Sequence, residues 1–462
     1  MSSRTDDRSK EDSGALLALA SEIAGRASKD EAIEAFVTHE REFYVKVYEG
    51  EVESLSSAQP RGAGVRVIVG GRAGFAYSTD LSTEGIEAVV AQARDNATYA
   101  TPDEAVAVAE RAESEPAPIP GLFDDEQPEV GPDDKVTFAL TLERATRAAD
   151  KRVRTVEEAV YGDSEADVAI AVSTGIAGSY RRSDAWCYSV AIAEDDGDTE
   201  IGFEFDLGRG LGSLDANEVA RQAAARAVGV LGASKIPSAR MPVVFDPYTA
   251  GQFLGVLGSA LTAEAVQKGR SLFAGRLGEA VASGNLSLID DGRAEGAPGS
   301  APWDAEGVAT QRTGVITKGV LTSYLYDTAS ARREGRPSTG NAARAGFKSA
   351  PGPAPSNMTF DTTGEGRDEV LRRAGRALLV QDFHGVHSGA NSVTGDFSVG
   401  VTGFLLEDGA PVRPVKEVTI AAPMLEILKG IEAVAVDRRW LPFGGSFGGA
   451  TTLISEMTVA GL

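Results

Sequence analysis

Two of the three histidines in the chain, His384 and His387, stand three residues apart in the glycine-rich stretch HGVHSGANSVTGDFSVG. Imidazole nitrogens are common zinc ligands, and a zinc ion held by such a pair could activate water for hydrolysis. Zinc-binding histidines on one helix are usually spaced i and i+4, and the neighbouring Gly385 and Gly389 disfavour a helix here. In an extended strand, an odd spacing sends the two rings to opposite faces. We therefore expect a loop whose imidazoles bond to backbone groups, and no metal site.

Other catalytic patterns are missing or incomplete. The chain has no G-x-S-x-G nucleophile elbow. Its single cysteine, Cys187, falls in the alternating stretch AWCYSVAIA, which is typical of a buried strand. The glycine-rich FGGSFGGAT of residues 443–451 lacks the Lys-Ser/Thr ending of a phosphate-binding loop, so its glycines are expected to allow tight turns. Residue chemistry alone leaves the function of the chain open.

The composition is that of a globular chain. Its 462 residues, of which 42% are hydrophobic and 24% charged, suggest two or three domains. No apolar run approaches the roughly 18 residues that span a bilayer, and the polar N-terminus lacks the apolar core of a signal peptide. One cysteine cannot form an intramolecular disulfide, which is compatible with a reducing compartment. We expect a cytoplasmic protein that does not associate with membranes.

The chain carries a net charge of −23, and the excess of acidic residues lies in the first half. Counted along the sequence, residues 236–462 carry a net charge of −2 and residues 1–235 a net charge of −21. Neither half has the basic surplus that neutralising a phosphate backbone requires, so we expect no nucleic-acid partner. The acidic residues are expected to form a solvated, repulsive surface that favours solubility.

The hydrophobic patterns predict an α+β fold, in which helix and antiparallel-strand modules precede a mainly antiparallel β C-terminal domain. The predicted divisions are a flexible tail (1–14), an N-terminal α/β module (15–100), an acidic, proline-rich connection (101–134), a central α/β module (135–235) and the C-terminal domain (236–462). The connection contains the run ESEPAPIPGLFDDEQPEVGPDD, which is a poor composition for a core.

Both modules of the first half have the order helix, strands, helix. In the N-terminal module helices are predicted at 15–27 and 83–98, with strands between them. In the central module helices are predicted at 135–150 and 215–232, on either side of strand-like runs. The similarity is one of element order and not of residues, so it suggests a duplication without establishing one. The second half begins with a buried-type strand and a helix predicted at 248–267.

A set of motifs follows in the second half. They are KGRSLFAGRLGE (268–279), LIDDG (288–292), DAEGVATQRTGVITKGVLTSYLYDTASAR (304–332), STGNAAR (338–344), PSNMTF (355–360), HGVHSGANSVTGDFSVGVTGFLLEDG (384–409) and the closing MTVAGL. Together with GVRVIVGGRAGFAYSTD in the first half, they resemble the TldD/PmbA family, whose members are called modulators of DNA gyrase or TldD/TldE peptidases. The resemblance covers nearly the full chain.

The family has two arms, and the resemblance implies a different metal chemistry for each. The TldD arm carries H-E-x-x-x-H on a helix and a later cysteine; these hold zinc, and the glutamate activates the attacking water. Counted back from Lys268-Gly269, Leu254 and Ser259 stand at the metal-binding positions and Gly255 at the general-base position. None of these three residues can do the chemistry, and the C-terminal stretch LPFGGSFGG has no cysteine. The chain is therefore most similar to the metal-free TldE/PmbA arm.

That arm implies a non-catalytic partner of a TldD-type zinc metallopeptidase. Such a complex degrades unfolded or modified peptides and, in some bacteria, removes leader peptides from precursors such as microcins. The resemblance implies zinc in the partner and none in this chain. We expect the nearly neutral second half to form a two-fold interface with the TldD-type chain and to pair with itself without one. A peptide groove is expected to include Asn341, His384, His387, Asn391 and Asp396.

Two other interpretations stay open on the sequence alone. One is a self-sufficient metallopeptidase of the same family that uses His384, His387 and a carboxylate such as Asp396. The other is a homodimeric peptide-binding module without hydrolysis. The small, apolar run FLGVLGSAL in the predicted helix at 248–267 fits the wall of a groove, an interface, or plain core.

Overall fold

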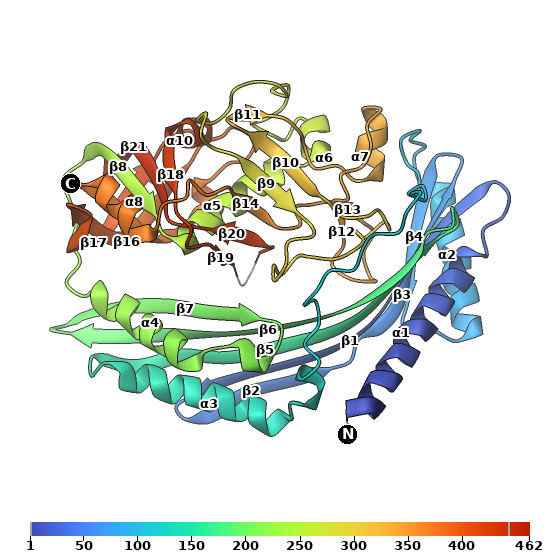
Figure 1. Ribbon diagram of the computed structural model, residues 1–462, viewed down its shortest axis with the longest axis horizontal. Coiled ribbons are helices and arrows are strands. Elements are labelled where there is room, and N and C mark those ends of the chain that lie inside the picture. Colours follow the sequence, from blue (N-terminus) through green and yellow to red (C-terminus); the bar gives the residue numbers. More distant parts are fainter. Residues whose placement is uncertain (1, 442–443) are drawn as a thin grey trace.

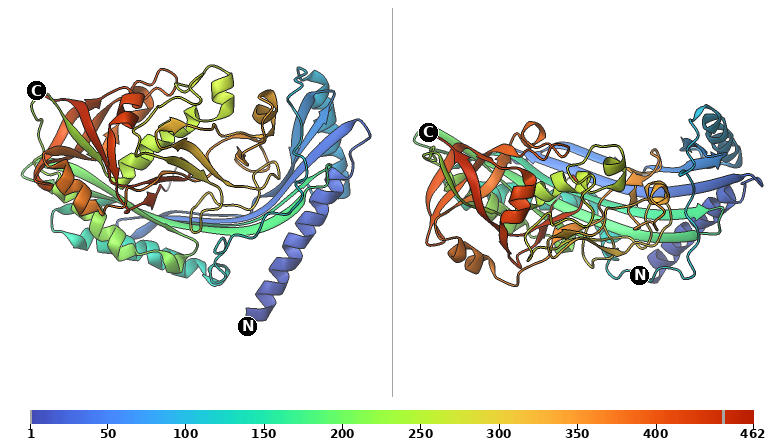
Figure 2. Two further views of the ribbon diagram at one scale, coloured as in Figure 1. Left: turned by 45° about the horizontal axis from the view of Figure 1, so that its top comes forward. Right: turned by 90° about the horizontal axis from the view of Figure 1, so that it is seen from above.

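The computed structural model describes the backbone of residues 2–441 and 444–462, and the side chains of residues 13–441 and 444–462. A long curved sheet, formed by the first half of the chain, cradles the C-terminal domain on its concave side (Figure 1). The left view of Figure 2 shows the same two layers after a rotation. Among the helices described, none combines the length and apolar character needed to cross a membrane.

The sheet of the first half has seven strands. The elements of this half are α1 (Ser2–Ala24), β1 (Glu31–Tyr48), β2 (Glu51–Ala58), β3 (Arg61–Val69), β4 (Arg72–Ser78), α2 (Thr83–Tyr99), α3 (Pro132–Ala149), β5 (Val153–Val172), β6 (Ala177–Asp195), β7 (Asp198–Gly208) and α4 (Ala216–Gly229). The strand order is β4-β3-β1-β5-β6-β7, and β2 pairs with β1 beside β3. All the pairings are antiparallel.

Side chains alternate between the two faces of β1, and this alternation decides which layer each one contacts. Its odd-numbered apolar residues pack against helices: Ile33, Ala35 and Val37 share a core with α1 and α2. Phe43 and Val45 share a second core with α3 and α4. Because neighbouring strand residues point to opposite faces, the even-numbered residues face the C-terminal domain. All four helices therefore cover the same, outer face of the sheet.

The two edge strands of this sheet, β4 and β7, each make the same kind of close contact with a helix. A Cβ atom on Gly74 of β4 would lie 2.0 Å from the carbonyl oxygen of Ala93 in α2. A Cβ atom on Gly202 of β7 would lie 2.2 Å from the carbonyl oxygen of Ala223 in α4. Each strand glycine thus lets a helix approach at an alanine. This shared detail supports a duplication, which the sequence suggests only through element order.

The C-terminal domain contains two six-stranded sheets and a short hairpin. Its elements are β8 (Ala239–Phe245), α5 (Pro247–Ala260), α6 (Ala263–Gln267), β9 (Leu288–Asp291), β10 (Arg312–Thr317), β11 (Val320–Leu321), α7 (Thr328–Arg333), β12 (Ala342–Ala343), β13 (Gly352–Pro353), β14 (Met358–Phe360), α8 (Arg367–Ala374), β15 (Ala377–His384), α9 (Val386–Gly389), β16 (Ser398–Glu407), β17 (Ala410–Ala421), α10 (Met424–Gly430), β18 (Ile431–Val434), β19 (Arg439–Trp440), β20 (Phe447–Gly449) and β21 (Thr452–Ala460). One sheet has the order β17-β16-β15-β8-β21-β18, and a further β17–β21 pairing closes five of its strands into a ring. The other has the order β11-β10-β9-β14-β20-β19.

The α+β fold class and the mainly antiparallel C-terminal domain are confirmed, since only β8–β15 and β14–β20 pair in parallel among the named strands described. Three local details differ from expectation. Helix α1 begins at Ser2, within the stretch predicted as a tail. The helix predicted at 248–267 divides into α5 and α6, because the hydroxyl of Thr262 caps a new helix by accepting from the N–H of Ala265 at 3.3 Å. The N-terminal and central modules share one sheet, since β1 pairs with β5 from Glu34 to Val47.

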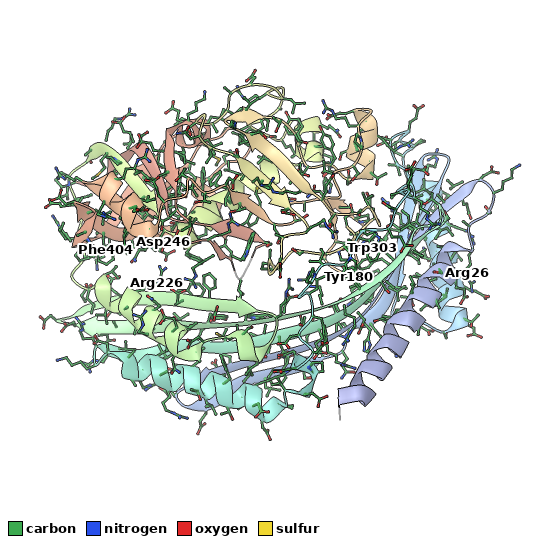
Figure 3. The ribbon with its side chains drawn as sticks, in the orientation of Figure 1. Arg26, Tyr180, Arg226, Asp246, Trp303 and Phe404 are labelled. Atoms are coloured by element: carbon green, nitrogen blue, oxygen red, sulfur yellow. The ribbon has the colours of Figure 1, made fainter. Side chains whose placement is uncertain are left out.

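Aromatic and charged contacts join the two layers. Tyr180 of β6 stacks on Trp303 of the C-terminal domain, with ring centroids 6.5 Å apart (Figure 3). Close to them, Arg209 and Arg182 donate to the carbonyl oxygens of Ala297 and Pro298, at 2.6 Å each. Acidic residues of the first half also join the layers, since Glu34 pairs with Arg344, and Asp198 and Glu200 pair with Lys416. These carboxylates do not belong to the solvated acidic surface that the sequence suggests.

Candidate functional site

Helix α5 carries Leu254, Gly255 and Ser259, the three residues that the sequence predicts to stand at the zinc-site positions of the TldD arm. The helix begins after Asp246, whose carboxylate accepts from the N–H of Thr249 at 3.0 Å, and Pro247 follows at the first helical position. An aspartate cap and a proline at this position both favour the start of a helix. The apolar residues of α5 then pack between the two sheets of the C-terminal domain, in its main core.

Leu254, Gly255 and Ser259 differ in burial. Leu254 is fully buried in that core. Gly255 is partly exposed, and Ser259 is exposed with its hydroxyl donating to the carbonyl oxygen of Val256 at 3.0 Å. Of the run FLGVLGSAL, the leucines and Phe253 are therefore plain core, and only Gly255, Val256 and Ser259 reach the surface.

The ring of Phe447 lies against the glycines of α5. A Cβ atom on Gly258 would come within 2.8 Å of this ring and within 2.9 Å of Pro355. A Cβ atom on Gly255 would lie 3.5 Å from the same ring, which is ordinary van der Waals contact. Strand β20 packs on α5 here, so the glycines of the helix allow the ring and the strand backbone to come close.

These residues do not fit a zinc ion. Leucine and glycine offer no ligand atom, and the Ser259 hydroxyl is a neutral group already bonded within its helix. Among the side chains of residues 13–441 and 444–462, no group of three His, Cys, Asp or Glu is arranged to hold a metal ion.

The histidine pair lies at the end of β15. Gly385 adopts a left-handed conformation (φ +74°) between His384 and a single helical turn, α9. The Nε2 atom of His384 lies 2.8 Å from the hydroxyl oxygen of Thr402 on β16, so the imidazole bonds to a side chain and not to the backbone group that the sequence suggests. His387 is exposed on α9.

The other residues assigned to a peptide groove lie apart from His384. Asn341 is 2% exposed, and its amide donates to the Asp290 carboxylate at 2.7 Å inside the domain, so it does not share a surface with the histidines. Asn391 and Asp396 belong to one exposed loop, in which the Asn391 N–H donates to the Asp396 carbonyl oxygen at 2.9 Å. The structure gathers these five residues into no single groove within the part of the chain it describes.

A cavity of about 760 Å³ opens between the outer edge of β7 and the ring of β15, β16 and β17. His384 and Thr402 line it together with Arg226, Tyr248 and Asp382, which sequence reasoning did not single out. One signal was available for Asp382, because it lies two residues before His384 and so shares its strand face. Arg226 and Tyr248 come from helices distant in sequence, and no local pattern connects them to this place.

Ion pairs frame this cavity. Arg226 of α4 donates to Glu204 at 3.0 Å and to Asp246 at 2.9 Å, and so connects β7 with the start of α5 (Figure 3). Lys416 of β17 bonds to Asp198 at 2.8 Å and also to Glu200. Burial raises the pKa of Tyr248 to about 12, and the nearby carboxylate of Asp382 adds to this shift.

A second ionic cluster is buried at the other end of the boundary between the two layers. Arg66 of β3 bonds to Glu34 of β1 at 2.5 Å and to Glu306 at 2.9 Å, and Arg344 also bonds to Glu34. Asp304 accepts from the N–H groups of Glu306, Val308 and Ala342, at 2.9, 2.9 and 3.0 Å. Burial, and then the charge of Glu306, raise the pKa of Asp304 to about 8.

Comparison with known proteins places these features in a family. Residues 33–97 match the model of the PmbA/TldA metallopeptidase domain 1, residues 125–231 that of the central domain, and residues 238–461 that of the C-terminal domain. The chain belongs to the PmbA/TldD family, whose named relatives are metalloproteases and whose common function is related to proteolysis.

Individual relatives align over most of their length. The metalloprotease PmbA of Escherichia coli O157:H7 is 29% identical over 437 residues, which is 94% of this chain and 93% of the relative. A metalloprotease TldD homolog of Haemophilus influenzae is 28% identical over 413 residues, 86% of this chain and 83% of the relative.

Solved structures show the same fold. TldE from Thermococcus kodakarensis superposes with a TM-score of 0.84 at 23% identity, covering 93% of this chain and 97% of that one. A candidate modulator of a DNA gyrase from Thermotoga maritima superposes with a TM-score of 0.85 at 24% identity, covering 98% and 100%.

Proposed function

We propose that this chain is a non-catalytic, PmbA/TldE-type subunit of a TldD-type zinc metallopeptidase complex. The observation that carries the proposal is the trio Leu254, Gly255 and Ser259 on α5. A peptidase of the TldD design needs two imidazoles and a carboxylate there. This chain supplies a buried leucine, a residue without a side chain and a hydroxyl bonded to Val256.

In this proposal the partner subunit holds the zinc and this chain holds none. The substrates of the complex are unfolded or modified peptides and peptide precursors. The alignment with a relative named as a TldD homolog, over 86% of this chain, supports a shared architecture. Two chains of one architecture can use the same patch for self and for partner, so this chain forms a homodimer when the partner is absent.

The proposal includes a cytoplasmic location, without a nucleic-acid or membrane partner. The single cysteine, Cys187, is a buried free thiol, which suits a reducing compartment. The net charge of −23 opposes binding to a phosphate backbone.

The deciding experiment compares peptide hydrolysis by this chain alone, by a co-encoded TldD-type chain alone, and by their mixture. We expect no hydrolysis from this chain, little from the partner, and full activity only from the mixture. Zinc content is measured on each purified chain. We expect zinc in the TldD-type chain and none in this chain. Replacing the partner's glutamate of H-E-x-x-x-H by glutamine should abolish the activity of the mixture.

A variant of this chain tests whether the Ser259 hydroxyl takes part in hydrolysis. Ser259→Ala removes the hydroxyl that stands at a zinc-ligand position, and the mixture should keep its full activity. Hydrolysis by this chain alone, with one zinc per chain, would establish a self-sufficient metallopeptidase instead. A mixture that neither forms a complex nor changes the rate of the partner would favour a homodimeric peptide-binding module.

A further inference from the structure

The cavity at the edge of β7 has a wall of aromatic rings. Phe203 of β7 and Tyr248 of α5 both line it, with ring centroids 5.5 Å apart. Phe205 packs behind them, 5.8 Å from Phe203 and 5.9 Å from Tyr248. Aromatic faces attract cations and pack well against methylene groups.

The fixed cations around this cavity are already neutralised. Arg226 is held between Glu204 and Asp246, and Lys416 bonds to Asp198 and Glu200. Arg439 adds a third cation, on the carboxylate of Glu204 at 2.7 Å. Glu417 also lines the cavity and pairs with Lys235 at 3.5 Å. With Asp382, the surroundings of the cavity therefore hold six carboxylates against four lysine and arginine side chains.

Asp382 is the carboxylate without a cation. It lies opposite Thr402 in the β15–β16 pairing and lines the cavity. No salt bridge to it is present within residues 13–441 and 444–462, and the nearby groups that favour its charged form are His384, the N–H of Phe383 and, more weakly, Arg226. Burial outweighs these groups and raises the pKa of Asp382. A partly buried carboxylate that faces an open cavity, as Asp382 does, is stabilised when a ligand brings the missing positive charge.

We propose that this cavity binds an alkylammonium group, with Asp382 as its counter-ion and the rings of Phe203 and Tyr248 against its methylenes. A lysine side chain, the amino terminus of a peptide, and a free polyamine share this chemistry. The volume of about 760 Å³ exceeds what one ammonium group fills, so several residues of a bound segment fit beside it. The proposal does not rest on the proposed function, because this chain alone forms the whole cavity.

Calorimetric titration of this chain without any partner tests the proposal. The probes are Nα-acetyl-lysine methylamide, alanyl-alaninamide and spermidine, and the neutral comparison is Nα-acetyl-norleucine methylamide. The lysine probe should bind at least about tenfold more tightly than the norleucine probe, since only the former supplies a charge for Asp382. The order among the three cations identifies the source: a side chain, a peptide terminus or a polyamine. Equal binding of the lysine and norleucine probes would overturn the proposal.

Two variants locate the binding. Asp382→Asn keeps the shape and should weaken binding of the cationic probes by about tenfold or more. It should fold at least as stably as the wild type, because burial already disfavours the charged form. Asp361→Asn changes an exposed aspartate outside this cavity and should leave the affinity unchanged. Loss of affinity in both variants, or in neither, would contradict the assignment of Asp382.

The pH dependence adds a check on the same group. Asp246, Arg226, His384 and Tyr248 also face Asp382, whose raised pKa makes it bind a proton as the pH is lowered. Affinity for the lysine probe should therefore fall as the pH is lowered, by a larger factor in the wild type than in Asp382→Asn. An equal fall in both would show that Asp382 is not the counter-ion.

Discussion

The guanidinium of Arg226 in α4 donates to the carboxylate of Asp246 at 2.9 Å, and this bond connects the first-half layer to α5, the helix on which we predict the zinc-site positions of the TldD arm. Asp246 is 1% exposed and also caps α5. One residue pair therefore fixes both the start of α5 and its position relative to β7.

Arg226→Met should lower the free energy of unfolding by about 3–5 kcal/mol, because it leaves Asp246 buried without its partner. Urea unfolding followed by circular dichroism measures the change. Arg221→Met is the matched control on the same helix, since Arg221 pairs with Glu218 on the exposed face. It should cost much less than Arg226→Met, because water screens an exposed ion pair. Equal losses in the two variants would show that the Arg226–Asp246 pair does not join the layers.

A graft of the zinc motif, Leu254→His with Gly255→Glu and Ser259→His, should not create a peptidase. Leu254 lies in the core, so its replacement by histidine removes apolar packing and should cost about 2–5 kcal/mol. The third protein ligand would still be missing, and an incomplete site binds zinc weakly and misplaces the water. Zinc analysis and a peptide hydrolysis assay on the graft measure the outcome. Robust hydrolysis by the graft alone would reveal a ligand already in place.

The exposed strip of α5 consists of Gly255, Val256 and Ser259. A charged side chain placed there tests whether this surface contacts the TldD-type chain. Gly258→Glu is unsuitable, because its Cβ atom would press on Phe447 and Pro355 and should destabilise the chain by about 1–3 kcal/mol. Ser259→Arg reaches solvent and should leave the thermal unfolding temperature unchanged. If α5 lies at the interface, Ser259→Arg weakens complex formation with the TldD-type chain and lowers peptidase activity, while Ser259→Ala does neither. An intact, fully active complex with Ser259→Arg would remove this strip from the mechanism.

The buried cluster around Glu306 should make stability depend on pH. Asp304 binds a proton in the folded chain up to about pH 8, whereas an unfolded aspartate loses it near 3.8. Between these values the folded state binds more protons, so its stability falls as the pH rises. The total loss should be on the order of a few kcal/mol.

Urea unfolding at several pH values from 4 to 8 measures this slope. Asp304→Asn should flatten it, even though the variant loses an acceptor for the Ala342 N–H and is less stable throughout. Asp396→Asn, on an exposed loop, should keep the wild-type slope. An unchanged slope in Asp304→Asn would assign the proton to another group.

Local patterns in the sequence predicted much of the framework. The helices predicted at 83–98 and 135–150 correspond to α2 and α3, because their amphipathic periodicity depends only on residues a few positions apart. The division of the helix at 248–267 was missed, since the capping hydroxyl of Thr262 competes with continued helix at one position.

The sequence by itself determined the residue types at 254, 255 and 259, the family, and the α+β order of elements. Only the tertiary structure decided that β1 pairs with β5, that the Asn341 amide donates to the Asp290 carboxylate, and that Asp382 faces a cavity. The physical reason is the sequence separation of the interacting residues. Helix and strand periodicity comes from neighbours along the chain, whereas sheet pairing and the partners of a buried polar group depend on which distant faces exclude water together.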